Sequence, residues 1–235
     1  MQQSDECIIC GAPLEYLDSP VEMECAICHR RFTNNVRCTE GHYVCDDCHT
    51  AGIDSIVGIC LHETSTNPVA IMERLMALPT CHMHGPEHHI MVGASLITAY
   101  HNAGGDVDMV WALSEMVRRG KKVPGGACGN WGACGAALSS GMFVSIVTRS
   151  NPLASKTWSL SNRMTSEALL NVSKHGGPRC CKRDSYLSIL AAVAFAREHL
   201  GVVMEPPTNI TCTRSRFNNQ CLKSNCPFFG QAFKI

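Results

Sequence analysis

Apolar residues recur with the spacing of amphipathic helices from about residue 66 onward, whereas the first fifty residues show no such period. Asn67 and Pro68 are typical of an N-cap and a first helical residue, and Gly201 is typical of a helix C-terminus. The pattern predicts helices over residues 68–78, 87–103, 107–119, 132–147, 165–175 and 184–200. No strand ladder and no internal repeat are evident, so we expect a mostly α protein.

The same pattern sets the expected architecture: a helical core, a small N-terminal zinc-finger-like module and an irregular cysteine-bearing C-terminal tail. The module is assigned to residues 1–52, and a helical domain of iron–sulfur type is assigned to residues 66–235. Because residues 1–52 hold little that could form a core, bound metal must supply the free energy that folds them.

Composition narrows the range of functions. The 235 residues carry 20 Lys and Arg against 20 Asp and Glu, so no nucleic-acid partner is indicated. The polar start MQQSDECIIC lacks the apolar core of a signal peptide, and the longest apolar stretches are too short to cross a bilayer. We therefore expect a cytoplasmic protein without membrane contact, whose 16 cysteines stay reduced and can bind metal.

Pairs of ligands with metal-knuckle spacing fill the N-terminal module and predict two tetrahedral zinc sites. The eight ligands are Cys7, Cys10, Cys25, Cys28, Cys38, His42, Cys45 and Cys48. A cross-braced arrangement, as in RING-type fingers, groups the first pair with the third and the second with the fourth, whereas a sequential arrangement groups neighbouring pairs. Tetrahedral sulfur also suits rubredoxin-like iron. We expect the module to be a structural clip, with docking of a protein partner as the alternative.

The stretch CHMHGPEHH places a thiol, four imidazoles and a carboxylate within nine residues. Pro86 suits a first helical turn, which puts Glu87 and His88 at a helix N-terminus, where free N–H groups favour anions. Histidine titrates near neutral pH, and glutamate is its common partner in proton transfer. We therefore predict catalytic roles for His84, Glu87 and His88, and a cofactor-binding role for Cys81.

Two further motifs combine cysteines with glycines or with cationic side chains. In VPGGACGNWGACGAA the glycines allow the backbone to approach a ligand closely, and in GGPRCCKRD positive charges flank a cysteine pair. The cofactor ligands predicted here are Cys128, Cys134, Cys180 and Cys181. Arg179 and Lys182 are predicted to stabilise thiolates and to hold an anionic substrate group, with a solvated helix start as the alternative.

The C-terminal tail carries Cys212, Cys221 and Cys226 in an irregular segment, and proline follows the last of them. Cysteines on such loops, with proline after the last one, are typical ligands of a [4Fe–4S] cluster. Three cysteines leave either a fourth ligand from elsewhere in the chain or one open iron that can bind a substrate or accept sulfur. Zinc, and free or disulfide-bonded cysteines, are the alternatives.

The motifs GHYVCDDCH, HGPEHH, GGACGNWGACG and GGPRCCKRD, together with the C-terminal Cys-Pro, resemble an uncharacterised cysteine-rich family of anaerobic archaea and bacteria, defined by a domain of unknown function. The resemblance covers nearly the whole chain and implies an anaerobic setting, which suits an oxygen-sensitive cluster. With altered spacing, the CGAALSSG and CC stretches also resemble a redox family with a GCAxxG core and paired cysteines.

These features predict a metal-dependent enzyme that holds two zinc ions and a [4Fe–4S] cluster. We expect a small or sulfur-bearing substrate in sulfur or one-carbon metabolism, for example with removal or transfer of sulfur at an open cluster iron. Lyase, sulfur transferase and oxidoreductase chemistry all fit this expectation. Two alternatives stay open: a zinc-only scaffold or regulatory protein that docks a partner, and a thiol–disulfide redox carrier.

Overall fold

The computed structural model describes residues 7, 9–10, 12–49, 53–206, 208–230 and 233–234. Its strands are β1 (Leu14–Glu24), β2 (Arg31–Cys38), β3 (Asn209–Ile210) and β4 (Phe233–Lys234). Its helices are α1 (Asp46–His49), α2 (Ile53–His62), α3 (Pro68–Met76), α4 (His88–Asn102), α5 (Met109–Gly120), α6 (Ala127–Asn130), α7 (Gly135–Val147), α8 (Lys156–Ser173) and α9 (Cys181–Phe195). Short helical segments are η1 (Ala196–Leu200), η2 (Ser215–Phe217) and η3 (Lys223–Asn225).

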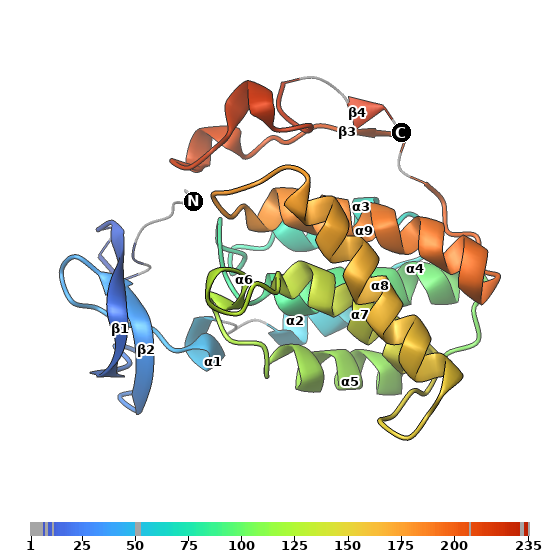
Figure 1. The fold of residues 1–235 in the computed structure, drawn as a ribbon, viewed down its shortest axis with the longest axis horizontal. Helices are drawn as coiled ribbons and strands as arrows, with labels where there is room; N and C mark the ends of the chain where they lie inside the picture. The colour runs from blue at the N-terminus through green and yellow to red at the C-terminus, as the bar shows by residue number, and fades with distance from the viewer. Residues whose placement is uncertain are drawn as a thin grey trace.

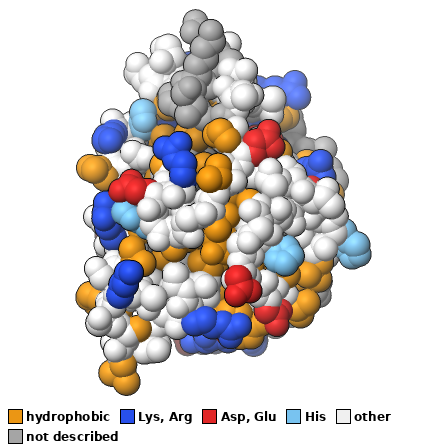
Figure 2. All heavy atoms as spheres, turned by 90° about the vertical axis from the view of Figure 1, so that its right-hand side faces the viewer, with side chains coloured by type: hydrophobic (Ala, Val, Ile, Leu, Met, Phe, Trp, Pro, Cys, Tyr) orange, Lys and Arg blue, Asp and Glu red, His pale blue; other side chains and the backbone are white. Residues whose placement is uncertain are grey.

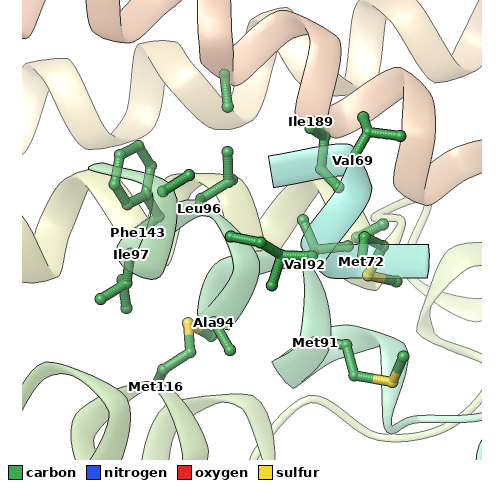
Figure 3. Packing of buried hydrophobic residues seen from close by; sticks show 14 of the residues in the cluster. Val69, Met72, Met91, Val92, Ala94, Leu96, Ile97, Met116, Phe143 and Ile189 are labelled. Atoms are coloured by element: carbon green, nitrogen blue, oxygen red, sulfur yellow. The ribbon is translucent and has the colours of Figure 1, made fainter. Parts of the chain in front are cut away.

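Helix α4 lies at the centre of the core and is buried on all sides from His88 to Tyr100. It contacts α2, α3, α5, α7 and α9. Figure 3 shows apolar side chains of α4, among them Val92 and Leu96, between residues of α3, α7 and α9. A helix that is apolar all round belongs inside a protein, and the predicted mostly α fold is confirmed.

The N-terminal module contains an antiparallel hairpin beside the helical core (Figure 1). Strand β1 pairs with β2 from Leu14 opposite Cys38 to Glu24 opposite Arg31. The expectation that the chain has no strand ladder was therefore wrong for this segment. The module buries only a small cluster around Met23, and a cluster of that size leaves metal binding to supply much of its stability.

The C-terminal tail crosses the core next to α3 and α9, at the top of the view in Figure 1. Arg214 Nη1 donates to Glu73 Oε2 at 2.7 Å, and the Tyr186 hydroxyl donates to the other carboxylate oxygen of Glu73. The rings of Tyr186 and Phe228 meet edge-on, with their centroids 5.1 Å apart. One carboxylate of α3 thus ties the tail to α9.

Some helix boundaries differ from the predicted ones. Helix α2 occupies residues 53–62, between the two predicted domains, and packs against the core. Helix α8 begins at residue 156 rather than 165, and α9 begins at residue 181 rather than 184. The first turn of α9 has no apolar period, yet Lys182 and Arg183 in it are buried, so they are not a solvated helix start.

The surface of the core mixes residue types. Figure 2 shows, on the face away from the module, hydrophobic side chains scattered among Lys, Arg, Asp and Glu side chains. None of the helices in the described segments is long and apolar enough to cross a membrane.

Gly141 marks a close approach of α7 to α8. A Cβ at this position would clash with Thr165 Oγ1 and lie 3.1 Å from the Ser161 carbonyl oxygen. Thr165 is β-branched and cannot easily rotate away, so we expect Gly141→Ala to lower the free energy of unfolding by about 1–3 kcal/mol. In Gly58→Ala, where no atom lies within 4 Å of the new Cβ, stability should stay constant or rise by up to about 1 kcal/mol. Denaturant unfolding measures both, and equal effects would contradict the close packing at Gly141.

Candidate functional site

The eight predicted ligands of the module come together in two groups of four, with the cross-braced pairing. The groups, each with ligand atoms within 4.8 Å of one another, are Cys7, Cys10, Cys38 and His42, and Cys25, Cys28, Cys45 and Cys48. The sequential alternative is therefore wrong. Sulfur separations of 3.7 Å for Cys28–Cys45 and 3.9 Å for Cys10–Cys38 match the spacing of roughly 3.8 Å that Zn–S bonds of about 2.3 Å impose on a tetrahedral site. Each group can hold a metal ion such as zinc.

Backbone N–H groups point at these sulfurs and favour their thiolate form. The His42 N–H donates to Cys38 Sγ at 3.2 Å, and the Cys45 N–H donates to Cys25 Sγ at 3.4 Å. At Cys28 the Arg30 N–H has the largest effect, and the pKa of this thiol falls to about 6. Thiolates held in this way are ready metal ligands.

The CHMHGPEHH segment forms a loop that leads into α4, and Glu87 occupies the predicted position at the helix N-terminus. Its carboxylate turns back toward the loop, where Oε1 accepts the His82 N–H at 2.9 Å. A Cβ on Gly85 would clash with this carboxylate, so a larger residue there would displace the Glu87 side chain. Glu87 and His88 are 2% and 1% exposed, respectively, so both side chains face the interior.

A buried ammonium group links this loop to the start of α9. Lys182 is fully buried, and its Nζ lies 2.6 Å from the His82 carbonyl oxygen and 2.9 Å from His88 Nε2. The same Nζ lies 3.1 Å from Cys81 Sγ. Because His88 Nδ1 donates to the Gly85 carbonyl oxygen at 3.0 Å, Nε2 presents a lone pair to the ammonium. Burial, followed by the charge of Lys182, lowers the pKa of His88 to about 4.

This geometry places several predicted site residues in the interior and not on the wall of either cavity described below. Lys182 lines neither of the two cavities, and its three N–H donors meet partners inside the protein, so the role found for it is structural and its role toward an anionic substrate stays a prediction. Glu87 and His88 belong to the same buried cluster. Ligand atoms of Cys81, Glu87 and His88 lie within 4.8 Å of one another, but the ammonium already supplies the positive charge there.

Cysteines from two distant segments line one small cavity between the tail and the start of α9. Cys212, Cys221 and Cys226 come from the tail, and Cys180 is the residue just before α9. The space among them, part of which is open to solvent, is about 390 Å³. The three tail cysteines therefore meet a fourth from elsewhere in the chain, which is one of the two predicted alternatives.

Each of these four sulfurs accepts a backbone N–H from two or three residues farther along the chain. The donor and acceptor pairs are Arg183 to Cys180, Arg214 to Cys212, Lys223 to Cys221 (at 3.4 Å) and Phe228 to Cys226. Burial has the larger effect and raises the pKa of the Cys180 thiol to about 11. The N–H groups suit anionic sulfur, and a bound cationic metal would offset the effect of burial.

A larger cleft of about 1040 Å³, partly open to solvent, lies between the module and the helical core. Its wall includes Tyr16, Arg37 and Asp46 from the module and His82, His84, His89, Cys128, Arg179 and Cys181 from the core. Thiols, imidazoles and guanidinium groups converge here, and such a concave site can bind a small polar or anionic molecule. Of the predicted catalytic residues, His84 and Arg179 face this cleft.

The histidines of the cleft are oriented by backbone groups. The Cys181 N–H donates to His84 Nδ1 at 3.4 Å, which places the proton of the neutral imidazole on Nε2. His89 Nδ1 donates to the Val123 carbonyl oxygen at 3.0 Å, and a Cβ on Gly135 would clash with the His89 ring. Sequence reasoning missed His82 and His89 as wall residues, although the density of histidines in the motif was the available signal.

Two predicted cofactor ligands, Cys81 and Cys134, line neither cavity. Cys134 precedes α7, and its Sγ lies 4.0 Å from Asp184 Oδ2, while burial raises the pKa of its thiol to about 12. The same oxygen accepts the Cys180 N–H at 3.4 Å. Cys134 therefore supports the start of α9, and Cys81 contacts the ammonium of Lys182.

His88 should make stability depend on pH. Its pKa is about 4 in the folded protein against 6.5 ordinarily, so between these values only the unfolded chain binds the proton. Stability is therefore fully present above pH 6.5 and falls as the pH drops toward 4, by about 3 kcal/mol in all. His88→Gln keeps an acceptor for Lys182 but does not titrate. Urea unfolding at pH 7 and pH 5 measures the difference in stability between the wild type and this variant, and the advantage of the wild type should shrink at pH 5. A difference that stays constant would show that His88 is not the source of the pH dependence.

Comparison with known proteins places the chain in a family. Residues 56–229 match the model of a Family of unknown function (DUF5714). The matched part spans the helical core and the four cysteines of the tail cavity, and it begins after the N-terminal module. No curated protein and no solved structure gave a significant match. Since residues 56–229 are well over half of the sequence, the chain belongs to the DUF5714 family.

Proposed function

We propose that the protein is a redox enzyme that holds a [4Fe–4S] cluster in the tail cavity and binds a small sulfur-bearing or anionic substrate in the neighbouring cleft. The observation that carries this proposal is the convergence of Cys180 with Cys212, Cys221 and Cys226 on one cavity. Four cysteine thiolates are the usual ligands of such a cluster. Sulfur or one-carbon metabolism of an anaerobe is the setting that suits it.

The spacing of the four sulfurs favours a cluster over a single zinc ion. In the described part of the chain, three groups have all their ligand atoms within 4.8 Å of one another, and the cysteines of the tail cavity belong to none of them. One tetrahedral zinc needs sulfurs roughly 3.8 Å apart. A cubane of four irons and four sulfides sits between its thiolates and holds them farther apart.

The surroundings of the cavity also suit an electron-transferring cluster. Met83, Tyr186, Phe228 and Phe229 are among its walls, and an apolar shell limits solvent access and tunes the reduction potential. Arg183 lines the cavity as well but is paired with Asp184 at 2.9 Å, so the backbone N–H groups are the main donors that can stabilise a negatively charged cluster.

A fourth cysteine changes the form of the expected reaction. With Cys180 as a ligand, each of the four irons carries a protein thiolate, and we therefore do not favour sulfur transfer at an open iron. The substrate instead belongs in the cleft, where His84, Arg179, Cys128 and Cys181 are available. Oxidoreductase chemistry fits this separation of cluster and substrate best.

We propose that the N-terminal module, with two zinc ions bound, forms one wall of this cleft. Tyr16 and Arg37 extend into the wall from the hairpin strands. Asp46 Oδ2 accepts the Gly125 N–H at 3.1 Å and thereby ties the module to the loop before α6. Bound zinc would fix the hairpin in this position, and docking of a protein partner would use the other faces of the module.

Metal analysis after anaerobic purification tests the cluster. We expect a brown protein with about four irons per chain and about two zinc ions. Cys180→Ser and Cys212→Ser should each lose most of the iron, because each removes a ligand, while the zinc content stays the same.

Cys181→Ser is the matched control, because it changes the same type of side chain one residue away, on the wall of the other cavity. It should keep the iron and the visible absorbance. A colourless wild-type protein that contains only zinc would overturn the proposal and would favour the zinc-only scaffold.

A further inference from the structure

Cys180 and Cys181 are consecutive, yet their side chains line different cavities. Cys180 has an extended backbone, with φ −144° and ψ 100°, whereas Cys181 is the first residue of α9. In extended backbone, successive side chains point to opposite sides. A single peptide unit therefore separates the cavity with four cysteines from the substrate cleft.

Cys181 is held firmly at the wall of the cleft and is partly exposed there. Its N–H donates to His84 Nδ1 at 3.4 Å, and its carbonyl oxygen accepts the Ser185 hydroxyl at 2.6 Å. The Gly85 N–H hydrogen-bonds its sulfur. Burial has the largest effect on the pKa of this thiol and raises it well above its ordinary value, although the charge of Arg179 and this hydrogen bond lower it. The guanidinium group of Arg179 belongs to the same wall. Arg179 can hold a bound molecule that carries negative charge next to this fixed sulfur.

We infer that Cys181 is the thiol at which a small disulfide substrate is opened, and that the electrons for this reaction arrive through the neighbouring Cys180. The inference rests on the proposed function, because Cys180 must be a cluster ligand for electrons to reach it. Arg179 in the cleft favours a disulfide that bears a carboxylate, whereas Arg37 in the same wall is paired with Glu15 at 2.7 Å.

The reaction balances in two steps. The Cys181 sulfur attacks one sulfur of the substrate RS–SR′ to form a mixed disulfide with RS, and the proton of the thiol ends on the leaving R′S group. Two electrons and two protons then cleave the mixed disulfide into RSH and the Cys181 thiol. A one-electron carrier protein would supply the electrons one at a time, and a cluster held by Cys180, Cys212, Cys221 and Cys226 would pass them on. Both protons come from solvent in the partly open cleft, because the Nε2 atom of His84 is itself buried.

The test uses the full chain, purified anaerobically with its iron, with glutathione disulfide as the probe and dithionite-reduced methyl viologen as the electron donor. Without the donor, peptide mass spectrometry should find glutathione on Cys181. With the donor, the wild type should release two thiols per disulfide. Cys181→Ser should show no adduct at this position and should lose turnover by about 100-fold, while its iron content and absorbance equal those of the wild type.

The outcomes separate this inference from the proposed function. An iron-loaded wild type that carries glutathione on Cys128 and not on Cys181 overturns the inference and leaves the cluster in place. Full turnover in Cys181→Ser also overturns the inference and leaves the cluster in place. A wild type that binds no iron overturns both. Cys180→Ser should lose both iron and turnover, while the adduct still forms on Cys181. This combination supports the order of the two steps, in which the attack by Cys181 precedes the arrival of electrons.

Discussion

The buried ammonium of Lys182 is the interaction on which the positions of both cavities depend. An unpaired charge in a protein interior costs several kcal/mol, and Lys182 avoids this cost by contacting Cys81, His82 and His88 in the loop before α4. Lys182 lies in the first turn of α9. The same contacts therefore fix the start of that helix, and with it Cys180 and Cys181, against the loop that carries His84.

The two kinds of cysteine site solve different structural problems. In the module, ligand pairs close in sequence meet at the spacing of a single ion and hold a hairpin that buries little apolar surface. In the tail cavity, ligands far apart in sequence meet across a wider space, so a cluster there would fasten the tail to α9. The contacts of Arg214 and Tyr186 with Glu73 bring the tail to this place independently of metal. The family match covers the tail cavity and begins after the module.

Local features were predictable from the sequence, and features that depend on long-range placement were not. The knuckle spacing predicts the ligands of the module because each pair lies within one turn. The hairpin of the module was missed because its strands are held by the metal-ligand pairs at their ends and not by a buried apolar face that would show in the sequence pattern. From the sequence, a lysine next to two cysteines is expected at the surface. Lys182 is buried because the loop before α4 covers it, and this long-range contact has no local signal. The division of Cys180 and Cys181 between two cavities depends on where the tail lies, which no local pattern encodes.

The separation of the two cavities has a chemical consequence. Thiols are strong ligands for iron, so a sulfur-bearing substrate that reached an open iron would bind there and compete with the protein. A cluster held by the four cysteines of the tail cavity would have no iron open to a substrate, and Phe228 and Phe229 close part of the wall. The substrate can then meet the protein only in the cleft, where Cys181 is the residue joined by one peptide unit to the cluster side. Under the proposed function, adjacent cysteines that face different cavities would allow electron transfer to sulfur without ligand exchange at the metal.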